Sequence, residues 1–170
     1  MISATVNLYT TDFRQARTYR AAALFVAGNI LLPQLCHLFS MGGPTWLPIY
    51  FFTLVGAYKY GWRTGLLTAI ASPAANALLF GMPAAAALPA ILLKSVVLAL
   101  VAGWTAARFR RASLLLLAGV VAVYQTLGTL GEWALTGDFY AAMQDFRIGL
   151  PGMIVQLFGG WAVINFVIRK

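Results

Sequence analysis

Residues Ala87 to Leu100 read ALPAILLKSVVLAL, a stretch that is apolar except for the lysine at position 94. Such a run is typical of a membrane-spanning helix, which needs about 20 mostly apolar residues. The rest of the chain has the same character, because 61% of its 170 residues are hydrophobic and only 9% are charged. Typical soluble domains carry about 25% charged residues. The composition therefore predicts a membrane protein and excludes an ordinary soluble domain.

Six apolar segments, separated by turn-forming sequences such as SMGGP, FGMP and RFRR, predict six membrane-spanning helices. Helices are expected because backbone polar groups in a bilayer must be bonded within their own segment. The predicted spans are 21–39, 46–58, 64–80, 84–107, 113–135 and 148–168. Residues 1–20 then form a short cytoplasmic segment, and residues 21–170 form one all-α, polytopic membrane domain.

The basic residues predict the orientation of this domain. With six spans, ten of the twelve lysines and arginines fall on one side of the membrane: Arg14, Arg17, Arg20, Lys59, Arg63, Arg108, Arg110, Arg111, Arg169 and Lys170. The other side has only Arg147, together with Glu132, Asp138 and Asp145. Because cytoplasmic loops carry the excess of basic residues, both termini are predicted to be cytoplasmic. The net charge of +8 does not indicate nucleic-acid binding, since the basic residues are scattered between apolar runs.

No catalytic or metal-binding pattern stands out in the sequence. The segment GAYKYGWRT, residues 56–64, has the glycine spacing of a phosphate-binding loop, but Trp62 and Arg63 replace its Lys-Ser/Thr pair. The single histidine, His37, follows Cys36, and adjacent helix positions point about 100° apart, which does not favour chelation of a metal. We expect neither enzymatic activity nor a cofactor in this chain.

Lys94 is the twelfth basic residue and belongs to neither side. A lysine at the middle of a bilayer costs about 2.5–3.5 kcal/mol, and Lys94 is expected about 15 Å below the outer start of its helix. We predict that it faces a solute cavity and pairs with an anionic group of the solute, because no acidic residue is expected at its depth. The alternative is an internal partner, such as a carbonyl, Glu132 or a glutamine.

Other polar and aromatic residues are candidates for the same cavity. Gln125 and Glu132 share one helix face with Gly128, at positions i, i+7 and i+3. Amides in membrane helices also hold neighbouring helices together, and tryptophans also anchor helices at the membrane interface, so both roles stay open. The predicted substrate-binding residues are Lys94, Gln125, Glu132, Trp133, Gln156, Trp46 and Asn76.

A stripe of small residues in the first span, Ala23 and Ala27 with Gly28 beside them, lets another helix approach closely. This stripe predicts either tight packing within the protein or docking of a partner. The sequence between Gly42 and Trp104 decides which interpretation we follow. It has a Leu-Pro at the start of the second span, a short glycine-containing turn, a Ser-Pro within the third span, a Gly-Met-Pro turn and a proline early in the fourth.

This combination resembles the substrate-binding S components of energy-coupling factor (ECF) transporters, closely over spans two to four and in outline over the last two. The resemblance implies a six-helix membrane protein of the prokaryotic plasma (inner) membrane that binds a vitamin or a vitamin-like small molecule near the outer face. It also implies a scaffold membrane subunit and two cytoplasmic ATPases as partners. Ala23 and Ala27 match the A-x-x-x-A motif that faces the scaffold. At Lys94 the chain departs from the family, whose members often carry an acidic residue in span four.

Two other functions compete with this one. The first is a small permease or channel that acts alone, which would need a continuous polar path. The cytoplasmic halves of the spans look dry apart from Asn165, so the sequence does not predict such a path. The second is a structural or assembly protein without a solute, in which Lys94 is paired internally.

Overall fold

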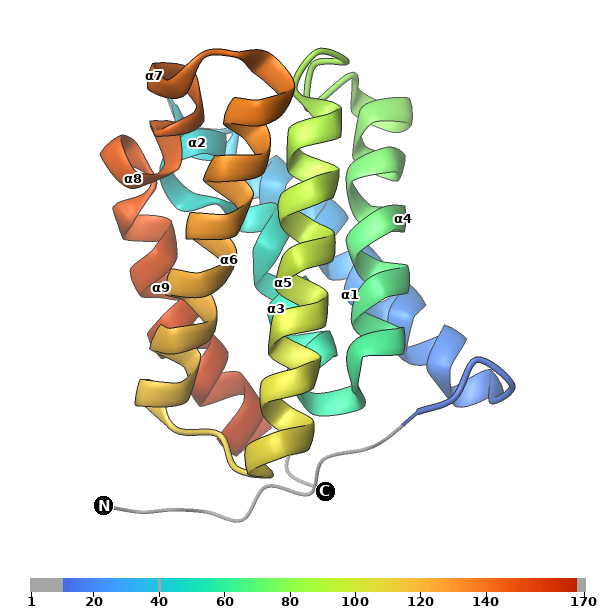
Figure 1. The fold of residues 1–170 in the computed structure, drawn as a ribbon. Coiled ribbons are helices and arrows are strands. Elements are labelled where there is room, and N and C mark those ends of the chain that lie inside the picture. Colours follow the sequence, from blue (N-terminus) through green and yellow to red (C-terminus); the bar gives the residue numbers. More distant parts are fainter. Residues whose placement is uncertain (1–10, 40, 168–170) are drawn as a thin grey trace.

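In the computed structural model, residues 11–39 and 41–167 are described, and within them the chain forms helices and no strand. This confirms the predicted all-α class. The long elements run side by side along one bundle (Figure 1): α1 (Ala16–Cys36), α3 (Phe51–Tyr60), α4 (Trp62–Phe80), α5 (Leu88–Phe109), α6 (Leu114–Thr136) and α9 (Leu150–Ala162), which continues as the π-helical turn η2 (Val163–Val167).

Short elements gather toward one end of this bundle (Figure 1): α2 (Gly42–Trp46), η1 (Pro48–Tyr50), α7 (Phe139–Ala142) and α8 (Gln144–Ile148). We call this end the capped end. The opposite end, where α5 passes into α6 through Arg108, Arg110 and Arg111, is called the basic end. The connection between α6 and α9, which lies between the last two predicted spans, is mostly helical. Asp138 begins α7 as a cap, because its carboxylate accepts a hydrogen bond from the backbone N–H of Ala141 at 3.0 Å.

Within the described residues, four helical segments are long and apolar enough to cross a membrane: α1, α5, α6 and the continuous stretch Leu150–Val167. Four of the six predicted spans therefore correspond to helices compatible with a membrane protein. The element α3 has only 10 residues, which at 1.5 Å per residue is about 15 Å of helix. Its apolar side chains are covered by neighbouring helices, and the helix itself is shorter than a usual membrane span.

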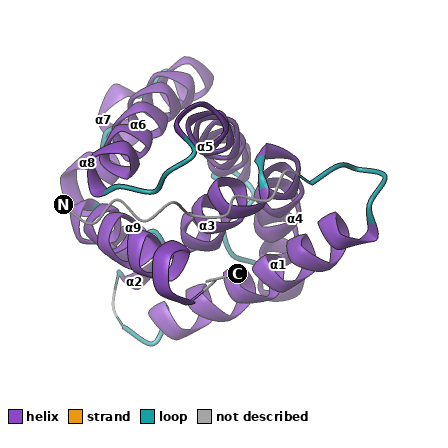
Figure 2. Ribbon diagram, turned by 90° about the horizontal axis from the view of Figure 1, so that it is seen from below, coloured by secondary structure: helices purple, strands orange, loops and turns teal. Residues whose placement is uncertain are grey.

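Helix α3 lies in the middle of the bundle, between α1, α4, α5 and α9 (Figure 2). Every residue from Thr53 to Lys59 is buried. The turn into α4 brings the two helices so close that a Cβ on Gly65 would lie 2.3 Å from the Cβ of Ala57. Only glycine permits this approach, and the central position of α3 depends on it.

Two helix starts differ from the sequence prediction. Helix α1 begins at Ala16 rather than at residue 21, so Arg17 and Arg20 lie on its first turns. Helix α5 begins at Leu88 rather than at residue 84, with Pro89 in its first turn, where proline is favoured. Lys94 is therefore about 9 Å from the start of its helix and not about 15 Å. It lies in the half of the bundle near the capped end.

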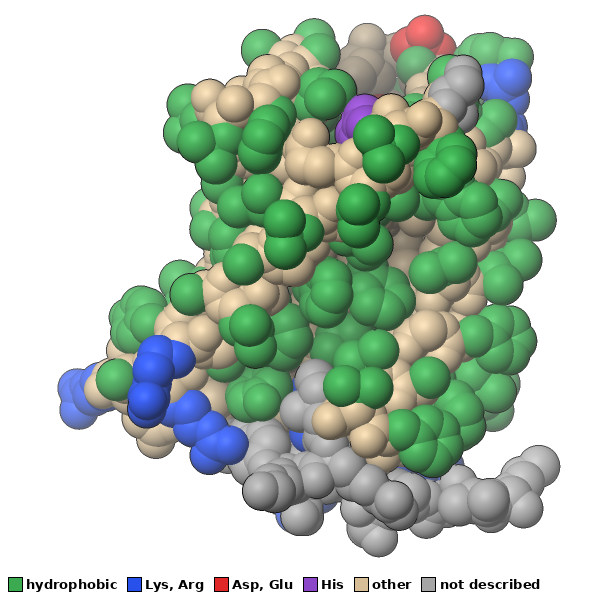
Figure 3. Space-filling model, turned by 180° about the vertical axis from the view of Figure 1, so that it is seen from behind, with side chains coloured by type: hydrophobic (Ala, Val, Ile, Leu, Met, Phe, Trp, Pro, Cys, Tyr) green, Lys and Arg blue, Asp and Glu red, His purple; other side chains and the backbone are tan. Residues whose placement is uncertain are grey.

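The flanks of the bundle are apolar. Leu78 on α4 and Leu115 on α6 are 86% and 83% exposed, and hydrophobic side chains cover much of the face seen in Figure 3. In the same view, lysines and arginines gather near the start of α1, at the basic end. A water-exposed surface of this kind would be unusual for a monomeric soluble protein, whereas a bilayer covers it.

Candidate functional site

A cavity of about 360 Å³ lies at the capped end, between α1, α2, η1, α4, α5, α6 and α8. Small-molecule sites usually occupy about 300–1,000 Å³, so the space suits a small solute. Its wall is largely apolar, with these polar residues: Gln34, His37, Tyr50, Asn76, Lys94, Glu132, Gln144 and Asp145. Four of the seven prolines also line it, namely Pro33, Pro44, Pro48 and Pro83. Because proline fixes its φ angle, this wall has little backbone freedom.

Lys94 lines the cavity and is only 3% exposed. Its ammonium group lies 2.5 Å from Oε2 of Glu132 and donates a hydrogen bond of 2.9 Å to Oδ2 of Asp145. The lysine thus has the internal partners of the second interpretation and also lies in the wall of a cavity, whereas its pairing with a solute stays a prediction. The expectation that no acidic residue lies at its depth is wrong. Because α5 starts later than predicted, Lys94 lies nearer the capped end of the bundle, beside Glu132. Helix α8 places Asp145 at the same depth in the bundle.

A glycine on α6 makes room for the lysine stem. A Cβ on Gly128 would lie 2.6 Å from Cγ of Lys94, so the stem runs directly across the surface of α6. Glu132 is one helical turn further along, where it meets the ammonium group. The shared face of Gln125, Gly128 and Glu132 predicted from the sequence is therefore the face that receives Lys94, although Gln125 does not line the cavity.

Gln125 and Gln156 lie deeper in the bundle and are fully buried. The hydroxyl of Tyr124 joins them, because it donates to Oε1 of Gln156 at 2.6 Å and accepts from Nε2 of Gln125 at 3.0 Å. Tyr124 packs against the cavity residue Tyr50, with ring centroids 5.7 Å apart. Among the described residues, Oε1 of Gln125 and Nε2 of Gln156 have no partner. The two glutamines form a polar layer beneath the cavity and join helices α6 and α9.

Asn76 lines the cavity from α4 and also belongs to a buried hydrogen-bond network. Its side-chain amide donates to the backbone carbonyl of Asn29 at 2.9 Å. Asn29 in turn donates to Ser72 at 3.2 Å and to Thr53 at 3.0 Å. These bonds connect α1, α3 and α4. The amide of Gln34 approaches Oδ1 of Asn76 at 3.4 Å, which links the network to the cavity wall.

The network extends into a row of buried polar residues along α4. Thr64, Thr68, Ser72 and Asn76 are spaced four apart and thus share one helix face. The row covers about 18 Å of helix and reaches the basic end, where the hydroxyls of Thr64 and Thr11 lie 2.8 Å apart. The expectation that the spans have no buried polar residue in this half of the bundle apart from Asn165 is therefore wrong. Threonine and serine spaced by four look like ordinary small residues in a hydropathy profile.

The two tryptophans proposed for the site are not among the residues that line the cavity. Trp46 and Trp133 are both exposed, and the ring of Trp133 packs edge-on against Phe139 at a centroid distance of 5.3 Å. Of the seven predicted substrate-binding residues, the structure brings Lys94, Glu132 and Asn76 to the cavity. Ala23 and Ala27 lie elsewhere, exposed on the outer face of α1.

Five polar residues that line the cavity were not predicted from the sequence: Gln34, His37, Tyr50, Gln144 and Asp145. Asp145 lies in a segment expected as an outer loop, and nothing in its local pattern showed that α8 folds back over the bundle. His37 was considered only as a metal ligand. Its Nδ1 lies 2.6 Å from the carbonyl oxygen of Pro33, and a carbonyl only accepts, so this nitrogen donates. The prolines at positions 33, 44, 48 and 83, all of which line the cavity, are the feature of the sequence that could have indicated its wall.

With this geometry in hand, we compared the chain with known proteins. No family model matches it, and neither does any curated protein or solved structure in the comparison.

Proposed function

We propose that the protein is a membrane-embedded solute-binding subunit of the ECF S-component type, which captures a small vitamin-like molecule from outside the cell. The observation that carries the proposal is the cavity at the capped end. It is small and mostly apolar, four prolines line it, and a few polar groups converge on it from α1, α4, α5, α6 and α8. Ligand sites in proteins share these features.

The distribution of charge supports an outward-facing cavity. The basic end carries Lys59, Arg63 and the arginines at the turn between α5 and α6. The cavity lies at the opposite end. If the basic end is cytoplasmic, as the positive-inside rule implies, α3 and α4 complete six crossings, both termini are inside, and the cavity opens outward. In a prokaryote this membrane is the plasma (inner) membrane.

Delivery of the solute would then depend on partner subunits. We infer a scaffold membrane protein and two cytoplasmic ATPases from the sequence resemblance. The exposed position of Ala23 and Ala27 supports docking rather than internal packing, because side chains on this face of α1 contact no other part of the bundle closely enough to be buried. Small residues on a lipid-facing helix let a second helix approach.

A co-purification experiment tests the binding function. The protein is extracted in mild detergent, and the small molecules it retains are identified by mass spectrometry. Ala90→Phe fills the cavity from α5, and Ala107→Phe places the same ring on an exposed position of the same helix. We expect one solute to accompany the wild type and Ala107→Phe and to be absent from Ala90→Phe. Identical small-molecule content in all three proteins would contradict the proposal.

A permease that acts alone is the second candidate, and the polar row along α4 favours it. The hydroxyl of Thr68, however, donates to the carbonyl of Thr64 at 2.9 Å, so this part of the row is satisfied within the protein. Proteoliposomes that contain only this chain separate the two functions. Uptake of the co-purified solute without partners or ATP would establish the permease, and binding without uptake supports the S-component function.

A further inference from the structure

We propose that the cavity selects a cationic solute, which presents an ammonium group to Glu132 and Asp145. The inference rests on the proposed function, since it assigns a chemical class to the solute of the same cavity. It also replaces the sequence-based expectation of an anionic solute group.

The fixed charge of the cavity is negative. Lys94 provides one positive charge, and Glu132 and Asp145 provide two negative charges, so the three side chains sum to −1. An anionic solute would meet a lysine that is already paired twice. A cationic solute would bring the total to zero beside carboxylates that are largely shielded from bulk water, because Asp145 is only 8% exposed.

Both carboxylates keep an oxygen available for a ligand. Lys94 engages Oε2 of Glu132 and Oδ2 of Asp145. The remaining oxygens, Oε1 and Oδ1, have no hydrogen-bond donor within residues 11–39 and 41–167. An ammonium group has three N–H donors and no acceptor, which matches two carboxylate oxygens that only accept.

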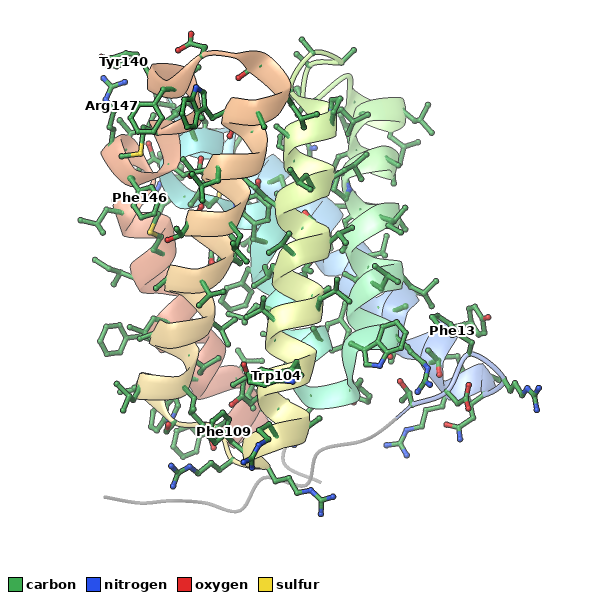
Figure 4. The ribbon with its side chains drawn as sticks, viewed as in Figure 1. Phe13, Trp104, Phe109, Tyr140, Phe146 and Arg147 are labelled. Atoms are coloured by element: carbon green, nitrogen blue, oxygen red, sulfur yellow. The ribbon has the colours of Figure 1, made fainter. Side chains whose placement is uncertain are left out.

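Neither of the other basic side chains at this end neutralises the two acids. The guanidinium carbon of Arg147 lies 3.7 Å from the centroid of the Tyr140 ring, and Figure 4 shows this pair on the outside of α7 and α8. His37 donates its Nδ1 hydrogen to Pro33. A neutral His37 therefore offers only an acceptor, Nε2, to its surroundings. Tyr50 adds an aromatic ring to the wall, and aromatic faces favour cations over anions.

The test uses three probes of nearly equal size that differ in charge: benzylammonium, benzyl alcohol and benzoate. Each is titrated into the purified full-length protein in detergent micelles, and binding is followed by calorimetry. Ala90→Phe gives the signal caused by partition into micelles. We expect benzylammonium to bind about tenfold or more tightly than benzoate, because the two probes differ by two charge units in a poorly screened site.

A charge-removing pair of variants provides the matched control. Glu132→Gln removes one negative charge, keeps an oxygen for Lys94 and leaves the Lys94–Asp145 pair intact. Asp138→Asn makes the same charge change at the same end but outside the cavity lining. Benzylammonium affinity should fall about fivefold or more in Glu132→Gln and stay within about twofold in Asp138→Asn. Benzyl alcohol should bind Asp138→Asn as it binds the wild type.

The outcomes separate this inference from the proposed function. If benzoate binds as tightly as benzylammonium, or if Glu132→Gln leaves their ratio unchanged, the cationic assignment is overturned. If the three probes bind equally and Ala90→Phe abolishes all of them, the cavity is still a solute site, and only its charge selectivity is wrong. If no probe binds the wild type above the Ala90→Phe signal, the cationic assignment and the binding function fail together.

Discussion

Lys94 is held by two carboxylates that come from different parts of the chain, Glu132 on α6 and Asp145 on α8. Lys94→Met leaves both acids in the buried site without a cation, and breaking a buried ion pair costs about 3–5 kcal/mol. We expect a large drop in the thermal unfolding midpoint of the detergent-solubilised protein. The triple variant Lys94→Met, Glu132→Gln, Asp145→Asn should recover most of it. A midpoint for Lys94→Met equal to that of the wild type would show that the ion pairs do not stabilise the fold.

The hydroxyl of Tyr124 is a second residue with a measurable role. It connects Gln125 and Gln156, and removing it leaves two buried amides with one partner fewer each. An unsatisfied buried polar group costs about 1–3 kcal/mol, so Tyr124→Phe should lower the free energy of unfolding by about this amount. Tyr19→Phe, on the exposed side of α1, is the control and should change little. Equal stabilities of the two variants would mean that the polar layer is not a structural link.

Among the elements, α6 offers two glycines in contrasting surroundings. A Cβ on Gly128 would meet the stem of Lys94 at 2.6 Å, whereas a Cβ on Gly119 would have no atom within 4 Å. Gly119→Ala should raise the free energy of unfolding by up to about 1 kcal/mol through helix propensity. Gly128→Ala should lower it by about 1–3 kcal/mol, because the stem is held by its ion pairs and cannot yield freely. If Gly128→Ala raises the free energy of unfolding as Gly119→Ala does, the stem of Lys94 is not confined by α6.

Helix α1 has its own test, which concerns docking. Ala23→Leu fills the small-residue stripe on an exposed face, and Ala107→Leu makes the same change on an exposed part of α5. If the proposed partner subunits are present in the cells, uptake of the proposed solute should fall several-fold for Ala23→Leu only, because a bulky side chain prevents close helix approach. Binding by the isolated protein should be unchanged. Parallel losses of binding and uptake would assign the stripe to the stability of the protein itself.

How far the sequence predicts each element depends on the strength of its local signal. Long apolar runs located α1, α5 and α6, and the prolines, glycines and arginines between them located the turns. The short helices α2, α7 and α8 have no hydropathy signal of their own, since four or five residues complete hardly more than one turn. Their positions depend on contacts across the bundle. Asp145 was therefore absent from the predicted site, whereas Lys94 was recognised from the cost of placing a charge in an apolar helix.

At the scale of the whole molecule, the two ends differ in charge, and this difference predicts how the protein sits in the membrane. In a Cys36→Ser background, a cysteine replaces the exposed Tyr140 at the capped end or the exposed Phe109 at the basic end (both labelled in Figure 4). An impermeant thiol reagent should label Tyr140→Cys in intact cells and Phe109→Cys only after the membrane is opened. The opposite labelling pattern would reverse the orientation and place the cavity on the cytoplasmic side.

Asp145 belongs to the segment between α6 and α9, and Lys94 belongs to α5. Any movement that lifts α8 away from the cavity must pull this carboxylate and ammonium apart, and charge separation in weakly polar surroundings is slow. Each additional 1.4 kcal/mol or so in the barrier lengthens the lifetime of a trapped molecule about tenfold. How long a solute of the proposed kind would stay inside is thus linked to a bond that the solute itself does not make. Residence time and binding strength could then be changed independently of one another.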